Sequence, residues 1–181
     1  WHHYSKKTDD YTDDVINLNK WLGELPKYNR FQNLPKVISE WGYDSYVNEI
    51  ADTNVGAAHT VASLRNLLNA EVELAFLFEI KDGVSPSWGI LTHDGAEKPR
   101  YHALKLLNSL EGNRIITDGE GSNVSALASI DERKIALVLT NYDDSGRNFE
   151  AVPVVFKNLD KANYKLTKKY LDGRSEISLN L

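Results

Sequence analysis

The feature that most constrains this chain is a change of hydrophobic pattern near residue 112. Before that point, short apolar runs alternate with segments whose apolar residues recur every three or four positions. Beyond it, short strand-like runs are separated by turn clusters rich in Gly, Asn and Asp. The first pattern is typical of α/β folds and the second of antiparallel sheets. We therefore predict two modules, residues 1–112 and residues 113–181.

In the first module the pattern predicts a repeated strand–helix–strand unit. Helices are expected at 13–25, 52–69 and 99–112, and buried strands at 34–41 and 72–80. Pro26 fits the end of the first helix, Pro99 the first turn of the third, and Gly112 its end. Apolar strands that alternate with helices are typical of parallel sheets.

The second module is expected to form an antiparallel β-sandwich, or part of one. Its strand-like runs lie at 114–117, 124–130, 134–140, 152–156, 164–170 and 177–179. Turn clusters such as 141–146 separate these runs. Short strands at this spacing are typical of sandwich domains.

Composition excludes several classes of function. Among 181 residues, 21 Lys and Arg stand against 26 Asp and Glu, and there is no Cys. The chain therefore has no disulfide scaffold, zinc ribbon or thiol nucleophile. A net charge of −5 without a basic cluster argues against nucleic-acid binding, and no apolar run is long enough for a membrane span. Because Met is absent, we expect a fragment or a processed product.

Polar and aromatic residues gather where the predicted strands stop. The three clusters are Trp1–Ser5, Ser39–Gly42 and Phe78–Gly83. The carboxyl ends of parallel strands meet at one edge of a sheet, so these clusters should converge there.

These clusters carry a family resemblance. Trp1-His2-His3-Tyr4, Ser39-Glu40-Trp41, Asp82, the run 88–91, Gly95 and the run 98–103 resemble the last third of a retaining glycoside hydrolase barrel of clan A. Family 39, which is xylosidase- and iduronidase-like, is the most similar, and heparanase-like enzymes share the first element. The resemblance covers residues 1–112. It implies strands six to eight of a (β/α)8 TIM barrel, followed by a β-sandwich.

The resemblance also implies roles for individual residues. Glu40 would be the nucleophile that attacks the anomeric carbon of a β-glycoside, and Tyr4 would orient it by hydrogen bonding. The residues expected to contact the sugar are His2, His3, Trp41, Phe78, Glu79, Asp82 and Trp88. Because neighbouring side chains on a strand point to opposite faces, one of His2 and His3 is expected to point away from the site.

Two departures from the family pattern limit what the resemblance implies. The general acid, an Asn-Glu at the end of strand four, would precede Trp1, and Asn48-Glu49 lies where the family does not place it. We therefore expect an incomplete catalytic unit that needs an N-terminal barrel segment, covalently joined or as a separate chain. In strand eight, Phe78 replaces a Trp platform, and Glu79 is an unusual charge that could bind a sugar hydroxyl or a basic substituent, or face solvent.

Two alternatives to a glycosidase stay open: a non-catalytic carbohydrate-binding or scaffold protein, and an independent interaction module that folds alone. The mechanism needs no cofactor. Neither the acidic cluster at 9–14 nor His59 and His102 has the spacing of metal ligands, so no metal is expected. Polysaccharide-acting relatives point to an extracellular or periplasmic location, although the sequence does not fix one.

Overall fold

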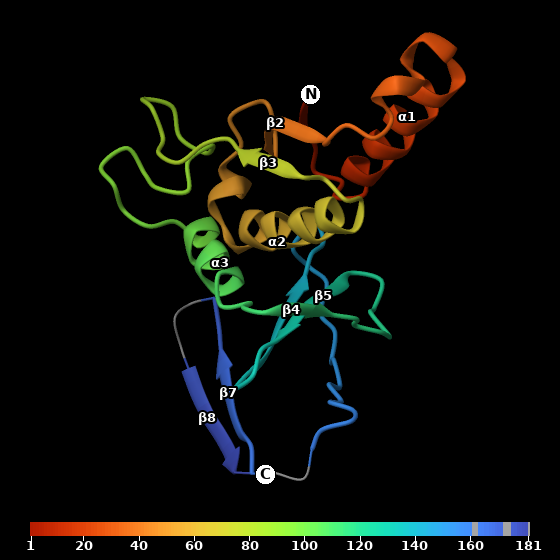
Figure 1. The fold of residues 1–181 in the computed structure, drawn as a ribbon. Coiled ribbons are helices and arrows are strands. Elements are labelled where there is room, and N and C mark those ends of the chain that lie inside the picture. Colours follow the sequence, from red (N-terminus) through yellow and green to blue (C-terminus); the bar gives the residue numbers. More distant parts are fainter. Residues whose placement is uncertain (161–162, 172–174, 181) are drawn as a thin grey trace.

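The structure, a computed structural model, describes residues 1–160, 163–171 and 175–180. Figure 1 shows an α/β part that carries the N-terminus and a β-rich part that carries the C-terminus. The elements in chain order are β1 (His2–Tyr4), α1 (Asp10–Glu24), η1 (Pro26–Phe31), β2 (Val37–Gly42), η2 (Glu49–Asp52), α2 (Asn54–Asn69), β3 (Leu74–Leu77), α3 (Pro99–Leu107), β4 (Asn113–Ile115), β5 (Val124–Ile130), β6 (Ile135–Asn141), β7 (Lys165–Lys169) and β8 (Ser175–Asn180).

The α/β part is built on a parallel sheet. Strands β1, β2 and β3 pair in the order β1-β2-β3, and every pairing is parallel. Helix α1 connects β1 to β2, and α2 connects β2 to β3. The strand–helix–strand pattern predicted from the sequence is thus confirmed.

Local sequence fixes where the helices begin and end. Acidic Asp10 and Asp13 lie in the first turn of α1, where they complement the helix dipole, and the helix ends just before Pro26. The Thr53 hydroxyl accepts a hydrogen bond from the Val55 amide and caps α2. Pro99 occupies the first turn of α3.

The third strand is shorter than the predicted 72–80. β3 ends at Leu77, although the Phe78 amide still donates to the Trp41 carbonyl. From Glu79 onward the backbone bonds instead to residues 88–91. Because these bonds satisfy the peptide groups locally, the chain leaves the sheet early and forms the loop 78–98.

The β-rich part contains two antiparallel sheets in the described residues. One has the order β4-β5-β6, and the other pairs β7 with β8. The strand predicted at 152–156 is wrong, because this segment pairs with no described strand and Val155 is mostly exposed. Helix α2 contacts both β5 and β6, so it lies between the parallel sheet and the β4-β5-β6 sheet (Figure 1).

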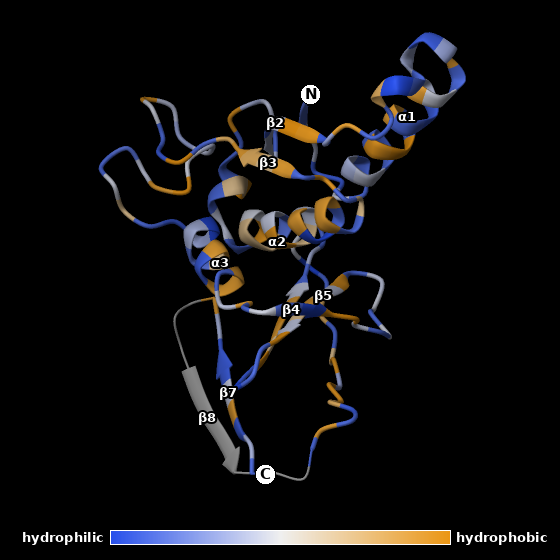
Figure 2. Ribbon diagram, in the orientation of Figure 1, coloured by the Kyte–Doolittle hydropathy of each residue, from blue (hydrophilic) through white to orange (hydrophobic). Residues whose placement is uncertain are grey.

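Two apolar clusters share helix α2. Leu67 packs with Tyr11, Ile38 and Trp41 under the parallel sheet. On the same helix, Ala57 and Val61 pack with Ala103 of α3 and with half-buried neighbours that include Val138 of β6. Figure 2 shows apolar residues along β3 and at the start of β2. Among the described residues, no helix has the length and apolar character needed to cross a bilayer.

Candidate functional site

One edge of the parallel sheet, called the rim, consists of the carboxyl ends of the strands and the loops that follow them. The register of β1 and β2 pairs His2 with Glu40 and Tyr4 with Gly42. Paired residues of neighbouring strands project to the same side, so His2, Tyr4 and Glu40 share one face. The Tyr4 hydroxyl donates a hydrogen bond to Glu40 Oε1, and His2 Nδ1 lies 3.6 Å from Glu40 Oε2. Both Glu40 oxygens therefore face a β1 side chain.

A β-bulge in β2 brings Glu40 to this face. Ile38 pairs with Ala75 and Trp41 with Leu77, so three steps along β2 match two steps along β3. The extra residue changes the alternation, and both Ile38 and Trp41 face the helices while Ser39 and Glu40 do not. The side chain of Glu40 keeps 31% of its surface exposed. A carboxylate that is hydrogen-bonded and open to solvent can meet a ligand.

Gly42 makes room for the Tyr4 ring. A Cβ atom at Gly42 would lie 2.9 Å from Tyr4 Cε1 and 3.4 Å from the Phe78 carbonyl oxygen. From the other side, the Tyr11 hydroxyl donates to the Gly42 carbonyl at 2.9 Å. The absence of a side chain at residue 42 thus sets where the Tyr4 hydroxyl lies relative to Glu40.

The surroundings of Tyr4 keep its hydroxyl protonated. Burial raises the pKa of Tyr4 well above its usual value, and the hydrogen bond to Glu40 and the charges of Glu40 and Glu79 raise it further. Tyr4 consequently acts as a hydrogen-bond donor to Glu40 over the whole physiological pH range.

The two adjacent histidines point in opposite directions, as the sequence predicted. His3 Nδ1 lies 2.5 Å from Asp14 Oδ2 of α1, and the Trp1 indole donates to the same oxygen at 2.9 Å. His2 faces Glu40 instead. The ring of His3 packs toward α1 and Tyr11 and not toward Glu40, so its position does not favour the expected sugar contact.

Two further expected contact residues are buried. Trp41 is 1% exposed and packs edge-on against Tyr11 in the core. Asp82 is 5% exposed, forms an ion pair with Lys98 and accepts the Gly89 amide at 2.6 Å. These positions do not favour the expected sugar contacts, because Trp41 lies in the core beside Tyr11 and the ion pair with Lys98 holds Asp82 inside the loop 78–98.

Aromatic residues of the loop 78–98 line the rim beside Tyr4. The Phe78 ring lies edge-on to Tyr4, with centroids 6.5 Å apart, and is 6.4 Å from the Trp88 ring. Glu79 follows Phe78, is half-buried, and its amide donates to the Trp88 carbonyl at 2.8 Å. The Trp88 indole donates to the Asp44 carbonyl at 3.0 Å. Phe78, Glu79 and Trp88 thus lie at the same rim as Glu40.

Sequence reasoning missed the residues that connect the rim loops. Asp44 forms an ion pair with Lys6 at 3.1 Å and accepts from the Asn48 side chain at 2.9 Å. Partial burial raises the pKa of Asp44, but hydrogen bonds from Asn48, the Tyr46 amide and Lys6 outweigh it, and the net shift is downward. Asp44 lies two residues beyond the end of β2, and this position is the sequence signal that could have identified it.

Three further polar residues among those the structure describes are Glu49, His59 and His102. Glu49 is exposed at the start of η2. His59 is buried, and His102 lies at the surface near Glu97. In the part of the chain that the structure describes, no three His, Asp or Glu side chains form a group able to hold a metal ion.

Comparisons with known proteins identify the fold. No family model and no curated protein matches the chain. A monomeric β-xylosidase from Caulobacter crescentus CB15 is 22% identical, with a TM-score of 0.56 over 72% of this chain and 27% of its own. The GH39 enzyme from Xanthomonas axonopodis pv. citri is 21% identical, with a TM-score of 0.63 over 82% of this chain and 29% of its own. A glucosidase from Croceicoccus marinus is 20% identical, with a TM-score of 0.63 over 97% of this chain and 37% of its own.

The fold and the rim together define a class: an α/β chain with the fold of part of a glycosidase. The family resemblance expected from the sequence is confirmed at the level of the fold, because solved GH39 enzymes are among its structural neighbours. The chain spans between 27% and 37% of the length of the three neighbours described above. At 20–22% identity, the likeness is one of fold.

Proposed function

We propose that this chain is part of a retaining β-glycosidase in which Glu40 is the nucleophile. The observation that carries the proposal is the hydrogen bond from Tyr4 to Glu40 across the ends of two parallel strands. Catalytic residues of parallel α/β folds lie at such strand ends. A carboxylate held by one hydroxyl, beside an imidazole at 3.6 Å, has the fixed orientation that nucleophilic attack needs.

The proposed reaction has two displacements at the anomeric carbon. In the first, a Glu40 carboxylate oxygen forms a bond to that carbon, the glycosidic bond breaks, and a second carboxyl group protonates the departing oxygen. In the second, water attacks the same carbon, gives up a proton to the second carboxyl group, and releases Glu40. Tyr4 donates to Glu40 Oε1 in the resting site and thereby fixes which oxygen attacks.

The second carboxyl group is proposed to lie on a barrel segment outside this chain. Two observations support a covering segment. Leu74 and Phe76 on β3 are 52% and 55% exposed, while Ala75 and Leu77 pack against the core. A strand that is apolar on both faces is typical of a sheet covered on both sides. We propose that the other strands of a (β/α)8 barrel cover the free face.

The substrate class follows from the neighbours and the rim. The structural neighbours include β-xylosidases and a glucosidase. Phe78 and Trp88 offer aromatic surface beside Glu40, and such surface packs against the C–H groups of a sugar. We propose a β-xyloside or β-glucoside as the first substrates to test.

Covalent trapping tests the nucleophile. The full-length protein that contains this chain would be incubated with a 2-deoxy-2-fluoro-β-xyloside or glucoside that carries an activated leaving group, and the labelled peptide would be mapped by mass spectrometry. We expect one fluorosugar on Glu40, none in Glu40→Gln, and label still on Glu40 in the matched variant Glu79→Gln. Label on another residue overturns the assignment. Sugar binding without label or turnover would favour a non-catalytic carbohydrate-binding protein.

A further inference from the structure

Arg100 is a buried cation that contacts backbone carbonyls. It is 1% exposed, lies in the first turn of α3, and its Nη2 reaches the carbonyl oxygens of Ser87, Trp88 and Gly89 at 2.8, 2.6 and 3.0 Å. Three consecutive carbonyls that converge on one nitrogen fix the path of the backbone between residues 87 and 89. Arg100 therefore holds the part of the loop 78–98 that carries Trp88.

Two carboxylates balance the charge around Arg100. Lys98 is 5% exposed, donates to Asp52 Oδ1 at 2.7 Å, and forms an ion pair with Asp82. Burial lowers the pKa of Arg100, and the charges of Asp52 and Asp82 oppose that shift. Two cations and two carboxylates form a neutral cluster in which Arg100, Lys98 and Asp82 are buried and Asp52 is partly exposed, and such pairing is what allows buried charges to persist.

The same cluster fixes Gly89 next to Trp88. Asp82 Oδ1 accepts the Gly89 amide, and a Cβ atom at Gly89 would lie 2.3 Å from the Asp82 amide and 2.4 Å from the Leu91 carbonyl. The loop backbone thus packs against Asp82 without room for a side chain. The residue after Trp88 is held by Asp82 while the Trp88 carbonyl is held by Arg100.

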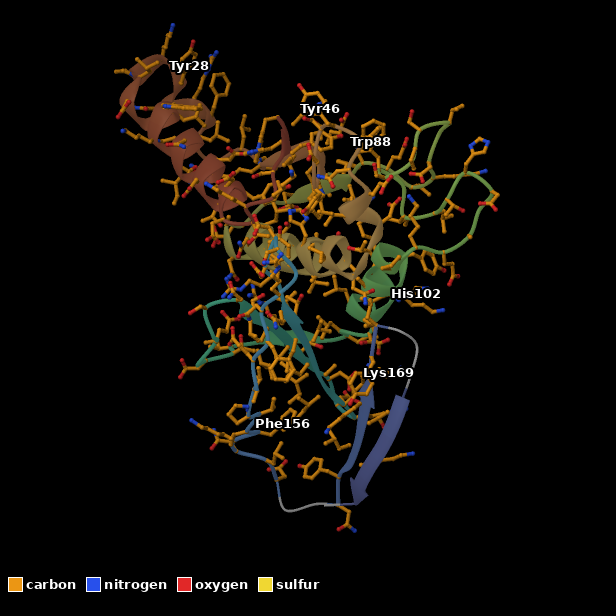
Figure 3. All side chains as sticks on the ribbon, turned by 180° about the vertical axis from the view of Figure 1, so that it is seen from behind. Tyr28, Tyr46, Trp88, His102, Phe156 and Lys169 are labelled. Atoms are coloured by element: carbon orange, nitrogen blue, oxygen red, sulfur yellow. The ribbon has the colours of Figure 1, made fainter. Side chains whose placement is uncertain are left out.

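Trp88 connects this cluster to the Glu40 site. Its carbonyl accepts hydrogen bonds from both Arg100 and the Glu79 amide, and its indole donates to the Asp44 carbonyl. Its ring meets Phe78, and Phe78 meets Tyr4, which is hydrogen-bonded to Glu40. Figure 3 shows Trp88 and Tyr46 at the same end of the α/β part. Contacts therefore run without a break from Arg100 to the proposed nucleophile.

We propose that Arg100 is a positioning residue that sets the place of the Trp88 ring at the sugar site, an inference that rests on the proposed function. Arg100 touches no reacting atom, so it acts on sugar binding through Trp88. Loss of its three carbonyl contacts raises KM and leaves kcat nearly unchanged. If Arg100 only stabilised the fold, its loss would lower the free energy of unfolding without raising KM at an unchanged kcat.

A double-mutant cycle in the full-length protein tests the proposal. With a 4-nitrophenyl β-xyloside or β-glucoside as substrate, Arg100→Lys is expected to raise KM about 10-fold, because a ring displaced by part of an ångström loses its fit to the sugar. The kcat should stay within about 2-fold. In a Trp88→Phe background, Arg100→Lys should change KM by less than about 3-fold, because the two residues act through one contact. Arg65→Lys, whose side chain pairs with Glu120 away from the rim, is the matched control and should leave KM unchanged.

Each outcome decides the proposal. The proposal is overturned if Arg100→Lys and Trp88→Phe change KM by independent factors that multiply in the double variant. It is also overturned if Arg100→Lys lowers the free energy of unfolding and leaves KM unchanged. If Arg100→Lys does not fold, Arg100→Gln gives the same cycle, because its shorter side-chain amide removes the charge and cannot keep all three carbonyl contacts. If the fluorosugar labels Glu40 but the effects of the two substitutions on the free energy are additive, the role of Arg100 is overturned and the proposed function is not. Absence of turnover and of label in the unaltered protein would overturn the proposed function as well.

Discussion

At the scale of single residues, side-chain direction separates the rim from the core. His2 and His3 are neighbours in sequence, yet one faces Glu40 and the other faces Asp14. The sequence predicted this division, because alternation along a strand is a property of the backbone. It did not predict the burial of Asp82, because the partner Lys98 lies sixteen positions away and only the folded loop brings the two charges together. Local pattern carries no information on such pairs.

His59 is the residue whose protonation should most affect stability. Its ring is 1% exposed, lies among Tyr11, Tyr43 and Tyr142, and its Nε2 is 2.7 Å from the Ser5 carbonyl. Burial lowers the pKa of His59 from 6.5 to about 4, the Arg100 charge adds to the shift, and the Ser5 carbonyl opposes it. The folded protein therefore holds His59 neutral where the unfolded chain takes up a proton.

The sign of the pH dependence follows from that lowered pKa. Above pH 6.5 neither state protonates His59, whereas between pH 6.5 and 4 only the unfolded state does. Stability from this residue is thus complete above pH 6.5 and falls as the pH drops toward 4, by about 3 kcal/mol.

Urea unfolding between pH 7 and pH 4 measures the effect. His59→Phe keeps an aromatic ring among the three tyrosines and removes the titrating group. The stability of this variant should therefore fall less steeply, as the pH is lowered, than that of the unaltered protein. His102→Phe, at a partly exposed position, should keep the original slope. Equal slopes for His59→Phe and the unaltered protein would contradict the prediction.

At the scale of elements, the bulge in β2 explains both a success and a failure of sequence reasoning. The apolar run 34–41 predicted a buried strand, and β2, at Val37–Gly42, begins three residues later and ends one residue later. A regular strand would place Trp41 and Ile38 on opposite faces, but both are buried on one face because the bulge adds a residue between them. The sequence shows this only as a three-residue spacing of large apolar side chains, which strand periodicity does not predict.

In the segment 152–156, the sequence predicted a strand that does not form. Its apolar and β-branched residues fit the composition of a strand. Strand formation also requires a neighbour to accept the backbone hydrogen bonds, and no described strand pairs with this segment. Pairing is a property of the whole sheet and cannot be derived from one run of residues.

The end of β2 also sets a steric limit at Gly42. In Gly42→Ala, the new methyl group would lie 2.9 Å from Tyr4 Cε1, so the Tyr4 ring must shift from the position in which its hydroxyl meets Glu40. If Glu40 is the nucleophile, as proposed, kcat/KM of the full-length protein should fall about 10-fold or more, and the unfolding free energy should fall by about 1–3 kcal/mol, as overpacking typically costs.

Gly83→Ala is the matched control for this substitution. A Cβ atom at Gly83 would meet nothing within 4 Å, although the residue lies in the same rim loop as Trp88. Its kcat/KM and unfolding free energy should stay close to those of the unaltered protein. Equal losses in the two variants would show that the Tyr4 ring does not depend on the space at Gly42.

At the scale of the whole molecule, helix α2 joins the two parts of the chain. Leu67 belongs to the cluster under the parallel sheet, and Val61 belongs to the cluster that reaches α3 and β6. The Thr140 hydroxyl of β6 also donates to the Ala58 carbonyl of the same helix at 3.3 Å. Because one rigid helix supplies both clusters, loss of either should release the other, and the two parts should unfold as one cooperative unit.

Hydrogen exchange in the full-length protein tests this cooperation. In the unaltered protein, amides of β2 and of β5–β6 should open with the same free energy. Val61→Ala removes buried apolar volume from one cluster only, and it should lower both opening free energies equally, by about 2 kcal/mol. Leu68→Ala, on the exposed side of the same helix, should change neither. A loss confined to β5–β6 would mean that the two clusters open separately, and that the rim keeps its geometry when the β-rich part does not.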